Sequence, residues 1–280
     1  MQWTTEFFQR NKLEEPRLAC EVLLAHAAGW KRIELYARFD QTITDEARGM
    51  FRELVQRAAE HEPIAYLVGK KEFYSLEFQV DQSVLIPRPE TETLVEVVFD
   101  HLSAAGNQSP HVLDIGTGSG CIAIALLKQL PEATAVATDN SADALAVAQR
   151  NAEQHDVAGR ITLLETNTVD DVPREPQFDA VLSNPPYVTE TDYRELAPAV
   201  RDFEPRSALT DGDDGLSFYR AIAQHAGDMI KDNGIVAVEI GYDQREAVGE
   251  LFNEHGSWKQ IGTWKDRVEG HDRVIMFTAS

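Results

Sequence analysis

Three glycines at alternate positions are the first residues in this sequence whose type and spacing suggest chemistry. The segment Asp114-Ile-Gly-Thr-Gly-Ser-Gly120 lies between two apolar runs, so we expect it to carry the chain from a strand into a helix. Glycine lets a backbone turn tightly and approach a ligand with no Cβ in the way. A dinucleotide-binding fingerprint would need glycine at position 121, where Cys121 stands, so a pyrophosphate cradle is disfavoured.

A single carboxylate, Asp139, stands at the end of the next expected strand. Its two oxygens could accept both hydroxyls of a ribose. The glycine loop alone could be a plain strand-to-helix turn, but together with Asp139 it favours a nucleoside-bearing cofactor without a diphosphate, and S-adenosylmethionine fits. We therefore expect cofactor contacts from Gly116, Thr117, Gly118, Ser119, Gly120 and Asp139. Asp114 could contact the methionyl ammonium through the loop or could equally brace the turn.

The segment Asn184-Pro-Pro-Tyr187 follows another expected strand and offers mainly hydrogen-bond acceptors. Two prolines remove two N–H donors and stiffen the backbone, which leaves the Asn184 side-chain oxygen and the Pro185 carbonyl. A planar –NH₂ group has two donors for such a pair, and Tyr187 supplies a flat apolar wall beside it. The segment suits an exocyclic amine or a carboxamide whose nitrogen is about to be alkylated. The plainer alternative is an Asn-Pro turn that leaves a strand.

Strands and helices alternate after Pro110, and this pattern must position both motifs. The expected strands are His111–Asp114, Thr134–Thr138, Ile161–Glu165, Phe178–Ser183, Gly234–Ile240 and two closing strands near residues 258–264 and 273–278. The expected helices are Cys121–Leu130, Ala142–His155, Leu216–Lys231 and Gln244–His255. Such alternation predicts an α/β domain with a mostly parallel sheet, whose ligands bind beyond the carboxyl ends of the strands. Both motifs fall at such ends.

The segment before Pro110 has a different pattern. Roughly the first sixty residues have helical spacing, with a stop at Gly29 and a cap at Thr44. Glu72–Val80 is expected to form a small hairpin, and Ile86-Pro-Arg-Pro89 a rigid extended connector before a helix over about residues 90–104.

Composition excludes several classes of protein. The formal net charge is −21, and most of it lies in residues 81–280, so the phosphate backbone of nucleic acid is disfavoured as the main partner. Cys20 and Cys121 form no disulfide framework and have no metal-ligand spacing, so we expect no metal. No window offers eighteen uncharged apolar residues and the N-terminus has no secretory pattern. We expect a cytoplasmic protein that contacts neither membrane nor nucleic acid.

With these motifs in view, the chain resembles the release-factor glutamine N5-methyltransferases (the PrmC/HemK family) over about residues 10–278. The resemblance rests on Tyr66-Leu-Val-Gly-Lys-Lys-Glu-Phe-Tyr74, Leu85-Ile-Pro-Arg-Pro-Glu-Thr-Glu92, Asp114-Ile-Gly-Thr-Gly-Ser-Gly-Cys-Ile-Ala-Ile-Ala125 and Ser183-Asn-Pro-Pro-Tyr-Val188. It continues through Phe203-Glu-Pro-Arg-Ser-Ala-Leu209, Asp214-Gly-Leu216, Glu239-Ile-Gly241 and Gly270-His-Asp-Arg-Val274. The run that begins at Leu85 is far more specific than the glycine loop or Asn-Pro-Pro-Tyr alone.

The resemblance implies a helical substrate-docking domain over residues 1–70, a hairpin and connector over residues 71–89, and a Rossmann-like, seven-stranded methyltransferase domain over residues 90–280. It implies methyl transfer from S-adenosylmethionine to the glutamine in the Gly-Gly-Gln loop of peptide chain release factors. We expect a monomer whose partner is the release factor.

The resemblance also assigns roles to particular residues. Catalysis falls to Asn184, Pro185 and Tyr187, and substrate binding to these three with Pro186. Asn167, Thr168 and Asn184 join the expected cofactor contacts. One departure is visible, because the family usually has an acidic residue followed by an aromatic one after the third strand. Here that stretch is Thr166-Asn-Thr168, so Asn167 could bond the adenine amine but the stacking ring is missing.

Three other functions share part of this pattern. A glutamine methyltransferase for a ribosomal protein would have the same core motifs. An adenine or guanine N-methyltransferase of nucleic acid would share Asn-Pro-Pro-Tyr but would need a basic groove. A non-catalytic interaction protein could keep the cofactor fold, although the intact glycine loop, Asp139 and the Asn184–Tyr187 segment disfavour it.

Overall fold

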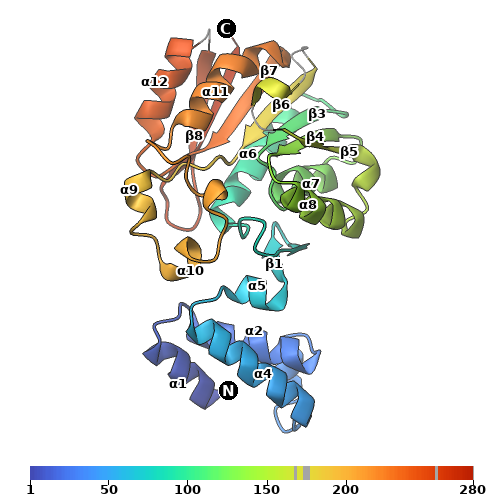
Figure 1. The fold of residues 1–280 in the computed structure, drawn as a ribbon. Coiled ribbons are helices and arrows are strands. Elements are labelled where there is room, and N and C mark those ends of the chain that lie inside the picture. Colours follow the sequence, from blue (N-terminus) through green and yellow to red (C-terminus); the bar gives the residue numbers. More distant parts are fainter. Residues whose placement is uncertain (167–168, 173–176, 256–257, 280) are drawn as a thin grey trace. The chain divides into compact units, whose positions relative to one another are not determined.

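The computed structural model of this chain describes residues 1–166, 169–172, 177–255 and 258–279 (Figure 1). Two compact units are present: Met1–Lys70 with Ala197–Phe203, and Lys71–Leu196 with Glu204–Ser280. The docking role of residues 1–70 and the boundaries after residues 70 and 89 stay predictions. None of the helices within the described ranges is long and apolar enough to cross a membrane.

The first unit is helical. Its helices are α1 (Gln2–Arg10), α2 (Pro16–Ala28), α3 (Glu34–Ala37), α4 (Asp45–Ala59), α5 (Ile64–Val68) and α10 (Pro198–Arg201). α2 ends at Gly29 in the left-handed conformation, and the Thr44 hydroxyl caps α4 by accepting a hydrogen bond from the Ala47 N–H at 3.1 Å, both as the sequence predicts. The helices enclose a small apolar core of Phe8, Ala19, Cys20, Leu23, Leu54, Val55, Ala58 and Leu67.

The second unit contains a hairpin and a seven-stranded sheet. The hairpin is β1 (Lys70–Phe73) and β2 (Leu76–Gln79). The sheet has the order β5-β4-β3-β6-β7-β9-β8, from β3 (His111–Ile115), β4 (Thr134–Asp139), β5 (Ile161–Glu165), β6 (Phe178–Ser183), β7 (Ile230–Glu239), β8 (Trp258–Lys265) and β9 (Asp272–Ala279). The first five strands in this order pair in parallel, and β9 pairs antiparallel with both of its neighbours, β7 and β8. This confirms the predicted α/β fold with a seven-stranded, mostly parallel sheet.

Helices cover both faces of the sheet (Figure 1). α6 (Glu92–Ala104), α7 (Cys121–Gln129) and α8 (Ala142–Gln154) lie on one face, and α11 (Ser217–His225) and α12 (Arg245–His255) on the other. Neighbouring strand residues alternate between the two cores: Val112 belongs to the first and Leu113 to the second. The strands are apolar on both sides because both faces are buried. A short helix, α9 (Glu190–Tyr193), follows the Asn-Pro-Pro-Tyr segment.

The largest difference from the predicted element boundaries lies between α11 and β7, and other elements shift by a residue or two. The helix expected over residues 216–231 ends at His225, a single 3₁₀ turn covers Ala226–Asp228, and β7 begins at Ile230. The reason is that the Met229 carbonyl accepts hydrogen bonds from both the Gln177 and Phe178 N–H groups, at 2.9 and 3.0 Å. β7 therefore begins at Ile230, before the start at Gly234 that the sequence predicts.

The register of the parallel strands places four strand ends side by side. Ile115 pairs with Thr138 on one side and with Ser183 on the other, and Ser183 pairs with Val238. The next residue along each strand therefore lies at the same carboxyl edge. Those residues are Gly116, Asp139, Asn184 and Glu239.

A buried asparagine joins the hairpin to the glycine loop. Asn151, on α8, has no exposed surface. Its amide nitrogen donates to the Gln79 carbonyl at 3.0 Å and to the Ser119 carbonyl at 2.9 Å, and its oxygen accepts from the Gln79 N–H at 2.7 Å. The Asn151 side chain thus fixes the position of the hairpin edge relative to the glycine loop.

Replacing Asn151 with Ala is therefore expected to lower the free energy of unfolding by about 1–3 kcal/mol, because buried backbone groups at Gln79 and Ser119 lose their partners. The matched control is Gln154→Ala, since Gln154 also bonds the hairpin but is exposed. Urea denaturation measures both variants, and equal losses for the two would contradict this role for Asn151.

Candidate active site

A cavity of about 470 Å³ lies at the carboxyl edge of the sheet. Its wall comes from the connector at residues 82–88, the glycine loop, the end of β4, the Asn-Pro-Pro-Tyr segment, residues 205–208 and Phe218. Of the residues predicted from sequence, it is lined by Gly116, Thr117, Gly118, Ser119, Asp139, Asn184 and Pro186. Gly120, Pro185 and Tyr187 are not part of this wall, and Asn167 and Thr168 lie outside the described residues. Thr166 and Val169, on either side of that pair, do line the cavity.

Backbone hydrogen bonds fix the glycine loop. The Gly116 and Thr117 N–H groups both donate to the Thr138 carbonyl, at 2.9 and 2.8 Å. Asp139 binds the loop from the next strand, since one of its oxygens accepts from the Gly118 N–H at 2.9 Å and the other from the Ser141 N–H at 3.0 Å. Each carboxylate oxygen keeps a lone pair for a further donor. Asp139 can therefore hold the loop and accept hydroxyl groups at once.

Asp114 braces the turn and keeps one oxygen free. It is fully buried, and its Oδ2 accepts a hydrogen bond from the Thr117 hydroxyl at 2.7 Å. Its Oδ1 and the Ser119 hydroxyl, also buried, have no partner among the described residues. Burial raises the pKa of Asp114 to about 6. Asp114 does not line the cavity itself, but its neighbour Ile115 and its hydrogen-bond partner Thr117 do. An unpaired buried acceptor in this position fits a cationic donor such as an amino acid's ammonium group.

Asn184 is oriented by Thr91, a residue of the run at 85–92 to which the sequence assigned no role. Its Nδ2 donates to the hydroxyl oxygen of Thr91 at 3.1 Å, and Thr91 is buried and also lines the cavity. Because the amide nitrogen is engaged, the carbonyl oxygen is the half of the Asn184 side chain that remains for a ligand. The Asn184 side chain is thus oriented so that its oxygen can accept a hydrogen bond from a ligand.

Tyr187 packs against the apolar core beside α11 and α12, and its hydroxyl donates to Glu239 Oε1 at 3.5 Å. Glu239 ends β7 and is 1% exposed. Burial raises the pKa of Glu239 to about 7 and raises the pKa of Tyr187 above its ordinary value. Thr91 lines the cavity, and Glu239 contacts the segment that follows Asn184. Both residues lie in runs on which the family resemblance rests, residues 85–92 and 239–241, but the sequence assigned neither of them a role.

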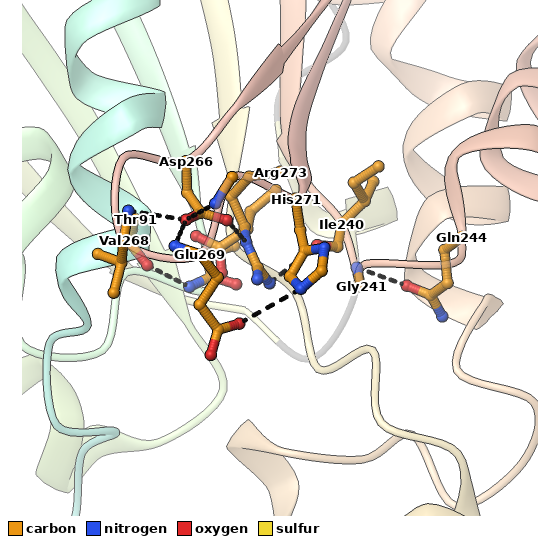
Figure 2. Close-up of polar contacts among 12 residues, drawn as sticks. Thr91, Ile240, Gly241, Gln244, Asp266, Val268, Glu269, His271 and Arg273 are labelled. Atoms are coloured by element: carbon orange, nitrogen blue, oxygen red, sulfur yellow. Dashed lines mark hydrogen bonds and ion pairs between the residues drawn. The ribbon is translucent and has the colours of Figure 1, made fainter.

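A buried ion pair lies near Glu239. Arg273, on β9, is 8% exposed; its guanidinium donates to Asp266 Oδ2 at 3.5 Å and to the Ile240 carbonyl at 3.3 Å (Figure 2). Asp266 in turn accepts hydrogen bonds from the N–H groups of Val268 and Glu269 (Figure 2). It also accepts one from the Gly270 N–H. The positive charge of Arg273 stabilises the ionised form of Glu239 and opposes the effect of burial.

No group of three or more His, Cys, Asp or Glu side chains within the described ranges is arranged to hold a metal ion.

Comparison with known proteins agrees with this geometry. A family model described as the PrmC N-terminal domain matches residues 1–69, and one described as the methyltransferase small domain matches residues 91–200. The release factor glutamine methyltransferase of Rhodopirellula baltica is 42% identical over 277 residues, which cover 98% of this chain and 93% of that protein. That of Geobacter sulfurreducens is 43% identical over 278 residues, which cover 98% of this chain and 94% of that protein.

This chain belongs to the release factor glutamine methyltransferase family. Membership implies S-adenosylmethionine as the methyl donor. The solved structure of a methyltransferase from Pyrococcus furiosus, at 19% identity and a TM-score of 0.54, covers 80% of this chain and 96% of that one and shows the same fold. The unpaired oxygen of Asp114, the glycine loop and Asp139 fit such a donor.

The segment after Asn184 is packed too tightly to move freely. The Gln244 side chain donates to the Tyr187 carbonyl at 3.0 Å, and its oxygen accepts from the Gly241 N–H at 3.0 Å. Gly215 lies against the same carbonyl: a Cβ at residue 215 would stand 2.2 Å from the Tyr187 oxygen. The backbone of Gly215 also has a φ of +74°, which L side chains rarely adopt.

Gly215→Ala is accordingly expected to displace the Tyr187 carbonyl and to lower both melting temperature and activity. Gly212→Ala is the matched control, because Gly212 has a similar φ of +82° but open space around it. Strain at φ > 0 costs about 1–2 kcal/mol in either variant. Only Gly215→Ala should lose more than this in calorimetric melting, and indistinguishable melting temperatures would show that the close approach is unimportant.

Proposed function

We propose that this enzyme transfers methyl from S-adenosylmethionine to the side-chain amide nitrogen (N5) of the glutamine in the Gly-Gly-Gln motif of peptide chain release factors. One observation carries the proposal. A single cavity is lined by the glycine loop, Asp139 and the oriented amide of Asn184, in a chain about 42% identical to release factor glutamine methyltransferases. The cavity volume, about 470 Å³, is in the range of sites that hold small molecules.

The cofactor half of the cavity would be formed by residues 116–119 and Asp139, together with the buried Asp114, which is bonded to Thr117. Asp139 would accept the ribose hydroxyls while it continues to bind the Gly118 N–H. Asp114 would accept a hydrogen bond from the methionyl ammonium through its unpaired Oδ1. When bound, S-adenosylmethionine supplies an electrophilic methyl group on a positively charged sulfur.

The acceptor half of the cavity would hold the substrate amide. A carboxamide nitrogen is a poor nucleophile because its lone pair is delocalised into the carbonyl. The Asn184 oxygen in the cavity wall and the carbonyl of Pro185, which adjoins that wall, would accept its two hydrogens. These bonds would raise the electron density on nitrogen and fix its plane. Alignment of this kind is worth up to roughly 7–11 kcal/mol in favourable systems. The nitrogen becomes strongly acidic once it is alkylated, so the reaction needs no dedicated strong base.

The release factor is the substrate that the family favours, and residues 1–70 are expected to dock it. Three large apolar side chains of that helical unit support this, since Trp3, Ile33 and Phe39 are 66%, 71% and 85% exposed. A net charge of −21 disfavours a nucleic-acid substrate. A ribosomal protein remains the nearest alternative. We expect the enzyme to be monomeric and cytoplasmic.

The proposal is tested by incubating the enzyme with methyl-labelled S-adenosylmethionine and, in parallel, with release factor, ribosomal proteins or total RNA. Label should enter the release factor. Label that enters only ribosomal protein or only RNA would assign the enzyme to one of the alternative classes.

Asp139→Ala should weaken binding of S-adenosylmethionine by about ten- to a hundredfold, which corresponds to roughly 1–3 kcal/mol for a lost acceptor pair. Glu165→Ala is the matched control, because Glu165 lies opposite Asp139 on β5 and does not line the cavity. Isothermal titration calorimetry measures both affinities. Unchanged affinity in a folded Asp139→Ala enzyme would remove Asp139 from the cofactor site.

Asn184→Ala should lower turnover far more than it lowers cofactor affinity, because the lost acceptor both leaves a substrate hydrogen unpaired and releases the nitrogen from alignment. The unpaired hydrogen alone costs about 1–3 kcal/mol. Tyr187→Phe should be milder than Tyr187→Ala, since the ring supplies the apolar surface.

Melting temperature, cofactor affinity and methylation rate are measured on these three variants. A role for Asn184 as a turn residue predicts that stability and rate fall in proportion. A folded, cofactor-binding Asn184→Ala enzyme with the parental rate would exclude the acceptor role.

A further inference from the structure

A half-buried phenylalanine in the first turn of α11 belongs to neither apolar core of the second unit. Phe218 lines the cavity, but the clusters on the two faces of the sheet do not include it. Among the described residues of the cavity wall it is the one aromatic side chain, and none of the ring–ring contacts within the described ranges involves it. A phenyl ring that faces a cavity instead of a core indicates a contact with a ligand.

The order of the strands determines which part of a bound S-adenosylmethionine reaches this ring. The argument rests on the proposed function, in which the methyl group faces Asn184, after β6, and Asp139, on β4, accepts the ribose hydroxyls. β3 and its glycine loop lie between these two strands, and β5 lies on the far side of β4. The methionyl part then lies over the glycine loop. The adenine, on the other side of the ribose, extends towards the end of β5.

The cavity wall at the end of β5 adjoins Asp139. The Thr166 N–H donates to the Asp139 carbonyl at 3.0 Å, and both Thr166 and Val169 line the cavity. Val169 begins a 3₁₀ turn and is buried in the same apolar cluster as Tyr219, the neighbour of Phe218 on α11. α11 packs against this turn. The first turn of α11 therefore borders the end of the cavity that the adenine would occupy.

We infer that the Phe218 ring stacks on the face of the cofactor's adenine. The two residues between Thr166 and Val169 are asparagine and threonine, so the end of β5 supplies no ring of its own. Aromatic side chains stack on nucleobases because every base has a flat π-face. Phe218 offers such a surface from a different element, α11, which the sequence brings to the cavity only through the fold.

The alternative ligand for the Phe218 ring is the substrate, because the same cavity also contains Asn184. A ring that contacts the substrate glutamine would change the KM for release factor and leave nucleoside binding unaltered. A ring that contacts adenine changes nucleoside binding in the absence of any substrate. Direct binding measurements therefore distinguish the two ligands.

The test measures the affinities of S-adenosylhomocysteine and of 5′-methylthioadenosine by isothermal titration calorimetry. The second compound carries the adenine and the ribose but lacks the amino acid. Phe218→Ala should weaken both by the same factor, roughly ten- to a hundredfold. Phe218→Leu, which keeps an apolar side chain without a ring, should lose most of that factor. Phe218→Tyr should stay within about threefold of the parent.

Phe99→Ala is the matched control. Phe99 is also a half-buried phenylalanine on a helix, but it packs against the core beside α6 and does not line the cavity. Phe99→Ala should lower the melting temperature and leave both nucleoside affinities unchanged. Phe218→Ala should weaken both nucleosides and change the melting temperature of the ligand-free enzyme less than Phe99→Ala does.

Parental affinity for both nucleosides in a folded Phe218→Ala enzyme would overturn the inference, and a raised KM for release factor would then assign the ring to the substrate. A loss confined to S-adenosylhomocysteine would place the ring at the methionyl part instead. Equal losses in Phe218→Leu and Phe218→Tyr would exclude stacking.

A parental enzyme that binds both nucleosides but labels no release factor would contradict the proposed substrate, and the binding data would still decide the role of Phe218. A parental enzyme that binds neither nucleoside would contradict both proposals.

Discussion

Parallel pairing of β3 with β4 and β6, and of β6 with β7, is the constraint on which the site depends. The backbone hydrogen bonds of these strands align Ile115, Thr138, Ser183 and Val238 in one row. Strand pairing alone therefore brings the next residue of each strand to the same edge of the sheet: Gly116, Asp139, Asn184 and Glu239. A shift of one residue in a single strand would turn its side chains to the opposite face and remove its polar group from the cavity.

Apolar packing on both faces of the sheet makes this alignment rigid and also sets its electrostatics. Asp114 and Glu239 are buried at strand ends, so their pKa values rise to about 6 and about 7. Hydrogen bonds are stronger in such surroundings, and an unpaired group is costly. The site can therefore fix the orientation of a small amide group, which is the task that methylation of a carboxamide nitrogen poses.

The sequence predicts what depends on local pattern. β5 and β6 have the predicted bounds, and the glycine loop, Asp139 and Asn184 meet at one cavity because parallel strands end at one edge. It does not predict contacts made by residues distant in the chain. Thr91 precedes a helix far from Asn184, and nothing in its neighbourhood shows that it bonds that amide. The close approach of Gly215 to the Tyr187 carbonyl is likewise a property of the packed structure.

The central claim is that the site recognises the substrate through two acceptors that face an –NH₂ group. The most direct measurement is the affinity of the enzyme, saturated with S-adenosylhomocysteine, for intact release factor and for release factor with the Gly-Gly-Gln glutamine changed to glutamate. The two proteins differ by one group, so contacts elsewhere cancel. At pH 8 a carboxylate would face two acceptors, and the glutamate form should bind at least about tenfold more weakly. Equal affinities would contradict the account.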